Sequence, residues 1–388
     1  MYQIAILDAM AGQAVILGGT LQARFRDLGL DPSRDLEFLD ENQLGLLRAD
    51  CGRVGVLFSK GPDGQRFAAA VRTLLDSPAV VVPVVASLTG FKDMVPSELY
   101  STNGMELDPA DPDREKIAAL VLELLGLLRK RRRLFISYKR TESAAVAQQL
   151  YHALDERTFD VFLDTLSVRP AEQFQEQLWH RMTDSDVVIL LYTQSVHQSG
   201  WVEQEIERAN GMKITVVQLI WPGVPRDPKT QLFEPLYLDF ADFDPECPGR
   251  LTASKASSIC TLVESLRASS LARREAELVG TLRDRAAKHQ LTTAVQPIRH
   301  VDVHCSARNF ARVIPSVGVP DSEAIHACAL APVDGVQPGQ IVLLYDSFNV
   351  TKTWTLHLDW LGGHLPVKTL KVFEVDTWLN NLSSNLCR

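Results

Sequence analysis

The sequence lacks any run of about 18 uninterrupted apolar residues, the length expected of a helix that crosses a membrane. It also lacks a basic leader, because the first residues read MYQIAILDAMAG and Asp8 interrupts their apolar run. This beginning is typical of a first β-strand rather than a signal peptide. We therefore expect a soluble, cytoplasmic protein that does not insert into a membrane.

Glycine-rich loops that bind phosphate are also missing. No GxGxxG motif follows a predicted strand and no GxxxxGK(S/T) motif occurs, so the sequence predicts neither a Rossmann-type dinucleotide site nor a P-loop. No GxSxG motif is present, which removes the usual position of a hydrolase nucleophile.

Positive charge and paired cysteines are scarce. The formal net charge is −8, which argues against the basic face of a nucleic-acid-binding protein. The one basic run, RKRRR at 129–133, lies between two apolar segments, and we interpret it as a linker or a helix end. The six cysteines have no paired spacing, so no disulfide framework is predicted.

Histidines and cysteines near the C-terminus raise the question of a metal site. In a strand, His300 and His304 share one face while Cys305 points to the other, and His326 and Cys328 follow only later. Zinc sites show tighter CxxC or HxxxH pairs. We expect structural roles for these side chains and no metal.

What is present is the composition of a globular protein. The chain has 388 residues, of which 46% are hydrophobic and 23% charged, enough for two or three domains with their own cores. Residues 1–130 alternate predicted strands (53–59 and 79–86) with predicted helices, the last over 114–130. Such alternation favours a parallel sheet covered on both faces.

The same rhythm continues after residue 130. Strands are predicted at 133–138, 160–164, 186–193 and 213–221, with helices at 143–156, 171–182 and 201–210. A long helix over 254–290 leads to a last block, in which IRHVDVHC, AIHACAL and QIVLLYDSF are predicted as strands and LDWLGGHLP and VDTWLNNL as short helices. We therefore predict an N-terminal α/β domain at 1–130, a second at 131–250, a helical linker at 251–290, and a C-terminal α/β or α+β domain at 291–388, regulatory or sensory in role.

The first two blocks have the same order of elements. An ungapped overlay of VVPVV (81–85) on VVQLI (216–220) places Ala70 opposite Glu205 and Arg66 opposite Trp201. Because doubly wound sheets share this order without common descent, the first block is either a degenerate relative of the second or an unrelated α/β domain.

The stretch WVEQEI at 201–206 permits two interpretations. In a helix, Trp201 and Glu205 lie four residues apart on one face. The stretch can be an ordinary charged helix start, with Glu203 near the positive end of the helix dipole and Glu205 paired with Arg208. Alternatively, Trp201 and Glu205 form one wall of a functional site.

Three motifs in order favour the second interpretation. FISYKR opens the first strand of the second block, FLD ends its second strand, and Trp-x-x-x-Glu begins its third helix. Residues 132 to about 245 thereby resemble the Toll/interleukin-1 receptor (TIR) domain. The resemblance is to the branch that cleaves NAD, which includes bacterial anti-phage defence effectors and an animal axon-degeneration enzyme. It implies a flavodoxin-like parallel sheet.

The resemblance also implies roles for residues. Glu205 matches the catalytic glutamate, and Lys139 and Arg140 match the basic pair that borders the nucleotide site. Residues 164–170 match the loop that gates the site and mediates assembly, although Arg169-Pro170 stands where a glycine is common. The substrate-binding positions implied are Phe135, Ser137, Tyr138, Lys139, Arg140, Asp164 and Trp201.

The implied activity is cleavage of the nicotinamide–ribosyl bond of NAD+, to nicotinamide and ADP-ribose or a cyclic isomer, with no cofactor. A lone carboxylate suits this chemistry, because the leaving group departs neutral and only the oxocarbenium-like ribose needs stabilisation. The protein would then be a regulated immune effector that depletes NAD, self-associates through its TIR domain and is activated by an unknown trigger. The alternative is a TIR adaptor that pairs with other TIR domains without chemistry.

Overall fold

The structure is a computed structural model that describes the chain except for residues 49–50, 78, 164–173, 197–210, 212, 297–299, 307–308, 331–337 and 387–388. The chain divides into two compact units. Unit 1 contains Met1–Lys130 and Ser257–Ser269, and unit 2 contains Arg131–Ala256 and Ser270–Arg388. Asp164, Trp201 and Glu205 lie outside the described residues.

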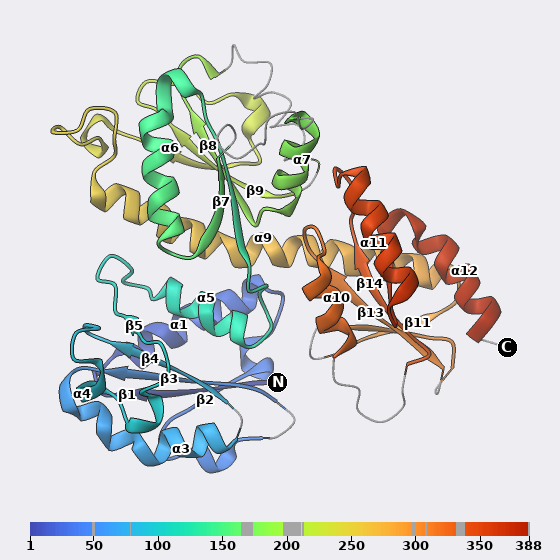
Figure 1. The fold of residues 1–388 in the computed structure, drawn as a ribbon, viewed down its shortest axis with the longest axis horizontal. Coiled ribbons are helices and arrows are strands. Elements are labelled where there is room, and N and C mark those ends of the chain that lie inside the picture. Colours follow the sequence, from blue (N-terminus) through green and yellow to red (C-terminus); the bar gives the residue numbers. More distant parts are fainter. Residues whose placement is uncertain are drawn as a thin grey trace. The chain divides into compact units, whose positions relative to one another are not determined.

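Unit 1 is built on a five-stranded parallel sheet of order β2-β1-β3-β4-β5. Its strands are β1 (Tyr2–Asp8), β2 (Leu36–Leu39), β3 (Gly52–Ser59), β4 (Val80–Val85) and β5 (Met105–Glu106). Figure 1 shows α1 (Gln13–Asp27) and α5 (Glu115–Leu124) on one face and α3 (Ala68–Asp76) on the other. Two short helices, α2 (Pro32–Asp35) and α4 (Phe91–Met94), complete the unit.

The helix predicted over 114–130 ends early. Helix α5 stops at Leu124, and Gly126 follows with a φ of +72°. The amide of Leu127 donates to the carbonyl of Leu122 at 2.8 Å, which closes the helix end around the left-handed glycine. The apolar pattern continues past this point, but the residues beyond it are not helical.

The first part of unit 2 is a second parallel sheet, of order β10-β9-β8-β6-β7. Its strands are β6 (Arg132–Ser137), β7 (Phe159–Leu163), β8 (Val187–Tyr192), β9 (Thr215–Ile220) and β10 (Glu234–Tyr237), with helices α6 (Arg140–Asp155) and α7 (Phe174–Asp184). Leu178 and Met182 of α7 pack on Val188 and Leu190 of β8 in a buried core. Counted from the first strand of each, this sheet and that of unit 1 have the same order, 2-1-3-4-5.

The C-terminal part of unit 2 is a mixed sheet of order β11-β12-β13-β14-β15. Strands β11 (Thr292–Val295), β12 (Val301–His304) and β13 (Phe310–Ser316) pair antiparallel, and β14 (Gln340–Tyr345) and β15 (Val367–Lys371) continue from β13 in parallel. One face packs on the end of α9 (Ala253–Lys288) and on α12 (Val375–Leu386). The other packs on α10 (Ser322–Ala329) and α11 (Lys352–His364).

The strand predicted at AIHACAL is wrong, because these residues belong to helix α10. Asp321 caps the helix by accepting a hydrogen bond from the Ala324 amide at 2.9 Å. Ile325 and Cys328, three residues apart, are the buried pair. A short apolar run without clear alternation does not distinguish a helix from a strand, whereas the cap does.

The cysteines differ from the prediction, whereas the helices agree with it. Cys51, Cys247, Cys260 and Cys328 form no disulfide, whereas Cys305 is disulfide-bonded. The chain therefore has a disulfide that the sequence did not predict, although not a framework of several. Among the described residues, no helix combines the length and apolarity needed to span a bilayer.

Helix α9 contributes residues to both units, and in unit 1 it supplies a buried cation. The Arg267 side chain is fully buried and forms an ion pair with Glu123 of α5, whose side chain is 7% exposed. Arg267 also donates to the backbone carbonyl of Arg129. A buried guanidinium is stable only while its partners remain, so this pair constrains how α9 joins unit 1.

Removal of the arginine should destabilise unit 1 strongly. We expect Arg267→Ala to lower the free energy of opening of unit 1 by about 3–5 kcal/mol, because it removes one partner of a buried ion pair. Native-state hydrogen exchange of the β3 amides is the measurement, since all six tryptophans lie outside unit 1 and their fluorescence cannot report on it. Arg283→Ala, an exposed position on the same helix, is the control and should change little. Equal effects of the two variants would contradict the role assigned to the buried pair.

Candidate functional site

The candidate site lies at the carboxyl edge of the second sheet. Strands β6 and β8 are parallel neighbours, with Ser137 of β6 opposite Leu190 of β8. The chain leaves β6 toward β7 and leaves β8 toward β9, which are on opposite sides of this pair. In open α/β sheets, ligands bind outside the carboxyl ends of the strands at this kind of topological switch point.

A lysine connects the two loops at this edge. The Lys139 ammonium, just after β6, donates to the Ser195 hydroxyl at 2.7 Å and to the Ser195 carbonyl at 3.3 Å. Ser195 follows β8, so the loops after the two strands are held together. Lys139 also pairs with Glu142 at 3.5 Å, and both side chains are about 30% exposed.

Glu142 completes the cluster from the first turn of α6. Its carboxylate accepts a hydrogen bond from the Ser195 amide at 3.4 Å. The nearby Thr193 side chain, the Ser195 amide and the charge of Lys139 hold the pKa of Glu142 below its usual value. The carboxylate is therefore ionised near neutral pH and contributes a negative charge beside the lysine.

The start of α6 is distorted where it meets this cluster. Ser143 has non-helical backbone angles, φ −136° and ψ 15°, inside the helix, and its hydroxyl donates to the Lys139 carbonyl at 3.2 Å. Arg140 and Glu142 therefore lie on a separate first turn. Amide groups at a helix N-terminus favour an anion, so the start of this turn and the exposed Arg140 side chain place positive charge at the edge, beside the negative charge of Glu142.

The substrate-binding residues predicted from the sequence do not all lie at this edge. Tyr138, Lys139 and Arg140 follow β6 and are at least partly exposed, while Ser137 is buried at the end of the strand. The Phe135 ring is 0% exposed and stacks on Phe162 with 5.4 Å between the ring centroids. In this structure the Phe135 ring belongs to the core.

Sequence reasoning did not identify Glu142 or Ser195. The available signal for Ser195 was its position in the polar stretch TQS, which directly follows the apolar strand β8 at the carboxyl edge. Glu142 had no sequence signal of its own, because a glutamate in the first turn of a helix is common.

The C-terminal histidines and cysteines have structural surroundings. Asp302 forms a buried ion pair with Arg312, with 2.8 Å between its carboxylate oxygen and the guanidinium Nε. Burial, followed by the charge of Arg312, lowers the pKa of His300 to about 4. In the part of the chain that the structure describes, no three His, Cys, Asp or Glu side chains are grouped to hold a metal ion.

A comparison with protein families identifies the domain that contains the second sheet. Residues 134–251 match the family model described as "TIR domain". The chain therefore contains a TIR domain, over less than a third of its length. No curated protein matches the chain.

Two solved structures that are similar to this chain are distant in sequence and in fold. The ADP-heptose lps heptosyltransferase II of E. coli is 12% identical, with 70% of this chain and 99% of that chain covered and a TM-score of 0.23. A conserved domain protein of Vibrio cholerae is 14% identical, with 82% and 93% covered and a TM-score of 0.20. TM-scores this low support no argument about the protein.

The contact between Glu142 and Ser195 can be tested directly. We expect Glu142→Ala to speed hydrogen exchange of the Ser195 amide roughly fivefold, the effect of losing one net hydrogen bond at a partly exposed position. Exchange measured on overlapping peptides that cover 193–196 gives the rate. Glu156→Ala, at the exposed far end of α6, is the control. If the two variants exchange alike at Ser195, the two loops are not coupled through Glu142.

Proposed function

We propose that the TIR domain cleaves NAD+ at the nicotinamide–ribosyl bond, with Glu205 as the catalytic residue. The observation that carries the proposal is the contact between Lys139 and Ser195. It joins the basic loop after β6 to the chain that continues, six residues after Ser195, into the Trp201-x-x-x-Glu205 motif. The TIR match supports the same assignment, because this family includes NAD-cleaving enzymes as well as adaptors.

The chemistry requires little more than one carboxylate. The bond between ribose C1′ and the nicotinamide nitrogen breaks with its electron pair going to nitrogen, which is already cationic, so nicotinamide leaves neutral. Positive charge develops on the ribose, and a nearby carboxylate stabilises it. Water then adds at C1′ and releases a proton to give ADP-ribose, or an adenine nitrogen adds there to give a cyclic isomer.

Other residues would bind the dinucleotide. The pyrophosphate is anionic, and the first turn of α6 with Lys139 and Arg140 offers positive charge beside the switch point. Tyr138 lies in the same loop, and Trp201 would cover the apolar wall of the site. Asp164 and Ser137 remain proposed contributors, whereas the buried Phe135 ring is proposed only as core support.

The cellular role would be a regulated effector that depletes NAD on a signal, as in anti-phage defence. An NAD-cleaving domain that acted at all times would exhaust its own cell, so its activity needs control. TIR domains commonly self-associate, and we propose that self-association completes the site. Residues 164–170, with the stiff Arg169-Pro170 pair, are the proposed contact.

Glu205→Gln should lower the rate of nicotinamide release on the order of 10²-fold or more, because the variant keeps the size of the side chain but removes the charge that stabilises the ribose cation. Nicotinamide release by the purified full-length protein, measured under conditions in which the parent is active, is the assay. Unfolding should be nearly unaffected, since a helix carboxylate contributes at most about 0.5 kcal/mol by ion pairing.

Glu203→Gln is the matched control, because it removes the same charge two residues earlier in the same motif, and it should remain near the parent. Full activity in Glu205→Gln would overturn the catalytic assignment. A parent that releases no nicotinamide, even when concentrated or crowded, would favour the adaptor.

Activity should also depend on assembly. If a neighbouring TIR domain completes the site, the specific activity should rise steeply with protein concentration rather than stay constant. The measurement is NAD loss at a series of enzyme concentrations, with sedimentation velocity of the same samples. A rate strictly proportional to the concentration of a monomer would exclude this part of the proposal.

A further inference from the structure

Within unit 2, the last residue of helix α7 is a buried carboxylate shared with the C-terminal sheet. The Asp184 side chain is 9% exposed and pairs with Arg133, at the start of β6. Its second oxygen accepts a hydrogen bond from the Val319 amide at 3.0 Å, in the loop between β13 and α10. One carboxylate thus joins β6, α7 and the C-terminal sheet.

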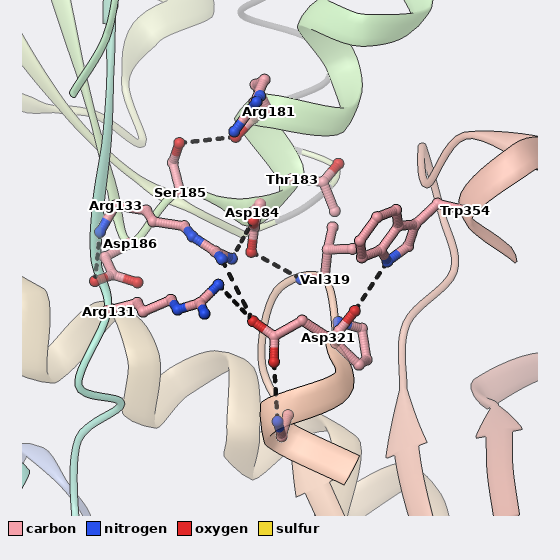
Figure 2. Close-up of polar contacts among 12 residues, drawn as sticks. Arg131, Arg133, Arg181, Thr183, Asp184, Ser185, Asp186, Val319, Asp321 and Trp354 are labelled. Atoms are coloured by element: carbon pink, nitrogen blue, oxygen red, sulfur yellow. Dashed lines mark hydrogen bonds and ion pairs between the residues drawn. The ribbon is translucent and has the colours of Figure 1, made fainter. Parts of the chain in front are cut away.

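A second carboxylate lies beside it. Asp321 pairs with Arg131 at 2.7 Å and with Arg133 at 3.7 Å, while its other oxygen caps α10 through the Ala324 amide. Figure 2 shows the guanidinium groups of Arg131 and Arg133 both directed at Asp321. The outer pair, between Arg131 and Glu323, is 55% and 69% exposed and adds little. The least exposed part of the contact is therefore Arg133, Asp184 and Asp321, whose side chains are 14%, 9% and 20% exposed.

A neutral contact extends this ionic contact along α7. The Thr351 amide donates to Nδ1 of His180, one turn before Asp184, at 3.3 Å. Burial lowers the pKa of His180, which keeps the imidazole neutral and its Nδ1 able to accept. The Trp354 ring stands edge-on to His180, with 6.0 Å between ring centroids. The Trp354 Nε1 donates to the Pro320 carbonyl, the bond drawn as a dashed line from Trp354 in Figure 2.

The end of α7 is also held from α9. The Arg274 guanidinium donates to the carbonyls of Thr183 and Ser185 at 2.7 and 2.8 Å, which satisfies acceptors at the helix C-terminus. With the contacts of Asp184 and His180, the last two turns of α7 are fixed to β6, to α9 and to the C-terminal sheet. The other end of α7 begins at Phe174, four residues after the segment 164–170 that we propose takes part in assembly.

The C-terminal loops that hold α7 are at a particular edge of their sheet. Residues 317–321 follow β13 and residues 346–351 follow β14, two neighbouring parallel strands. This is the carboxyl edge, where open α/β sheets bind ligands. Here the edge binds α7 through charged and backbone groups. Such a polar contact between parts of one chain separates more readily than an apolar core.

We propose that the C-terminal sheet restrains α7 through the Arg133–Asp184–Asp321 contact, and that release of this contact lets the TIR domain assemble. Only the last step, increased nicotinamide release, rests on the proposed function. The restraint itself concerns the structure and association of the TIR domain.

The test is Asp321→Asn in the full-length protein. Asparagine caps a helix as well as aspartate, so α10 keeps its cap while the charge that faces Arg131 and Arg133 is removed. Asp359→Asn is the matched control, because it removes the α11 carboxylate that pairs with Lys371 of β15. Three readouts are compared: hydrogen exchange of peptides covering 174–184, sedimentation velocity, and nicotinamide release.

We expect Asp321→Asn to speed exchange in α7 about tenfold, the effect of losing a charged hydrogen bond, and to shift the protein toward larger species. Nicotinamide release at fixed concentration should rise by a similar factor, and the control should match the parent. Arg131→Gln should act in the same direction. The double variant should show no larger effect than Asp321→Asn alone, because both changes remove the same ion pair between Arg131 and Asp321.

The outcomes separate the two proposals. Unchanged exchange and sedimentation in Asp321→Asn would overturn the restraint. Faster exchange with less association would also overturn it, because the contact would then support assembly. Faster exchange and more association, with no nicotinamide released by parent or variant, would uphold the restraint and overturn NAD cleavage.

Discussion

Parallel pairing of β6 with β8 is the constraint on which the candidate site depends. Two parallel strands end at the same edge, so the chain that leaves β6 and the chain that leaves β8 must begin there side by side. Both strands are buried on both faces, and only their ends and the following loops can carry polar chemistry. Lys139 and Ser195 meet because of this pairing, although 56 residues separate them in the chain.

The sheet of unit 1 shows that the parallel pairing of strands does not by itself determine the chemistry of a domain. It has the same strand order as the TIR domain, and α3 lies between its third and fourth strands, as the segment containing Glu205 lies between β8 and β9. Where the overlay places Glu205, unit 1 has Ala70 in α3. A common fold is compatible with different functions, and the chemistry depends on side chains placed at the edge. We therefore assign the proposed activity to the TIR domain alone.

The basic run at 129–133 has more than one structural role. The Arg129 carbonyl accepts from the buried Arg267 in unit 1, while Arg131 and Arg133 meet carboxylates of unit 2. Arg132 is buried, with its guanidinium over the Phe159 ring. The run 129–133, which we interpreted as a linker because of its charge, is therefore held by contacts along its length. The restraint on α7 uses two of these arginines, because a guanidinium can bind two carboxylates at once.

The sequence alone determined which segments are strands and helices wherever the apolar pattern was long. The apolar runs at 186–193 and 213–221 became β8 and β9, and the charged pattern at 254–290 became α9. The motifs FISYKR, FLD and Trp-x-x-x-Glu identified the TIR domain because they occur in order along the chain. Local signals weaker than these were misjudged, as at α10 and at the end of α5, where a cap or a single glycine decides the outcome.

Tertiary structure decided which polar groups meet. The pairs Lys139–Ser195 and Arg131–Glu323 span 56 and 192 residues, and no periodicity in a single sequence encodes such partners. It also decided that Phe135, part of the most specific motif, is a core residue, because its burial depends on which face of β6 meets Phe162 and α7. Side-chain pattern is a local property of the chain, whereas contact depends on how strands pair and helices pack, and only the folded chain sets these.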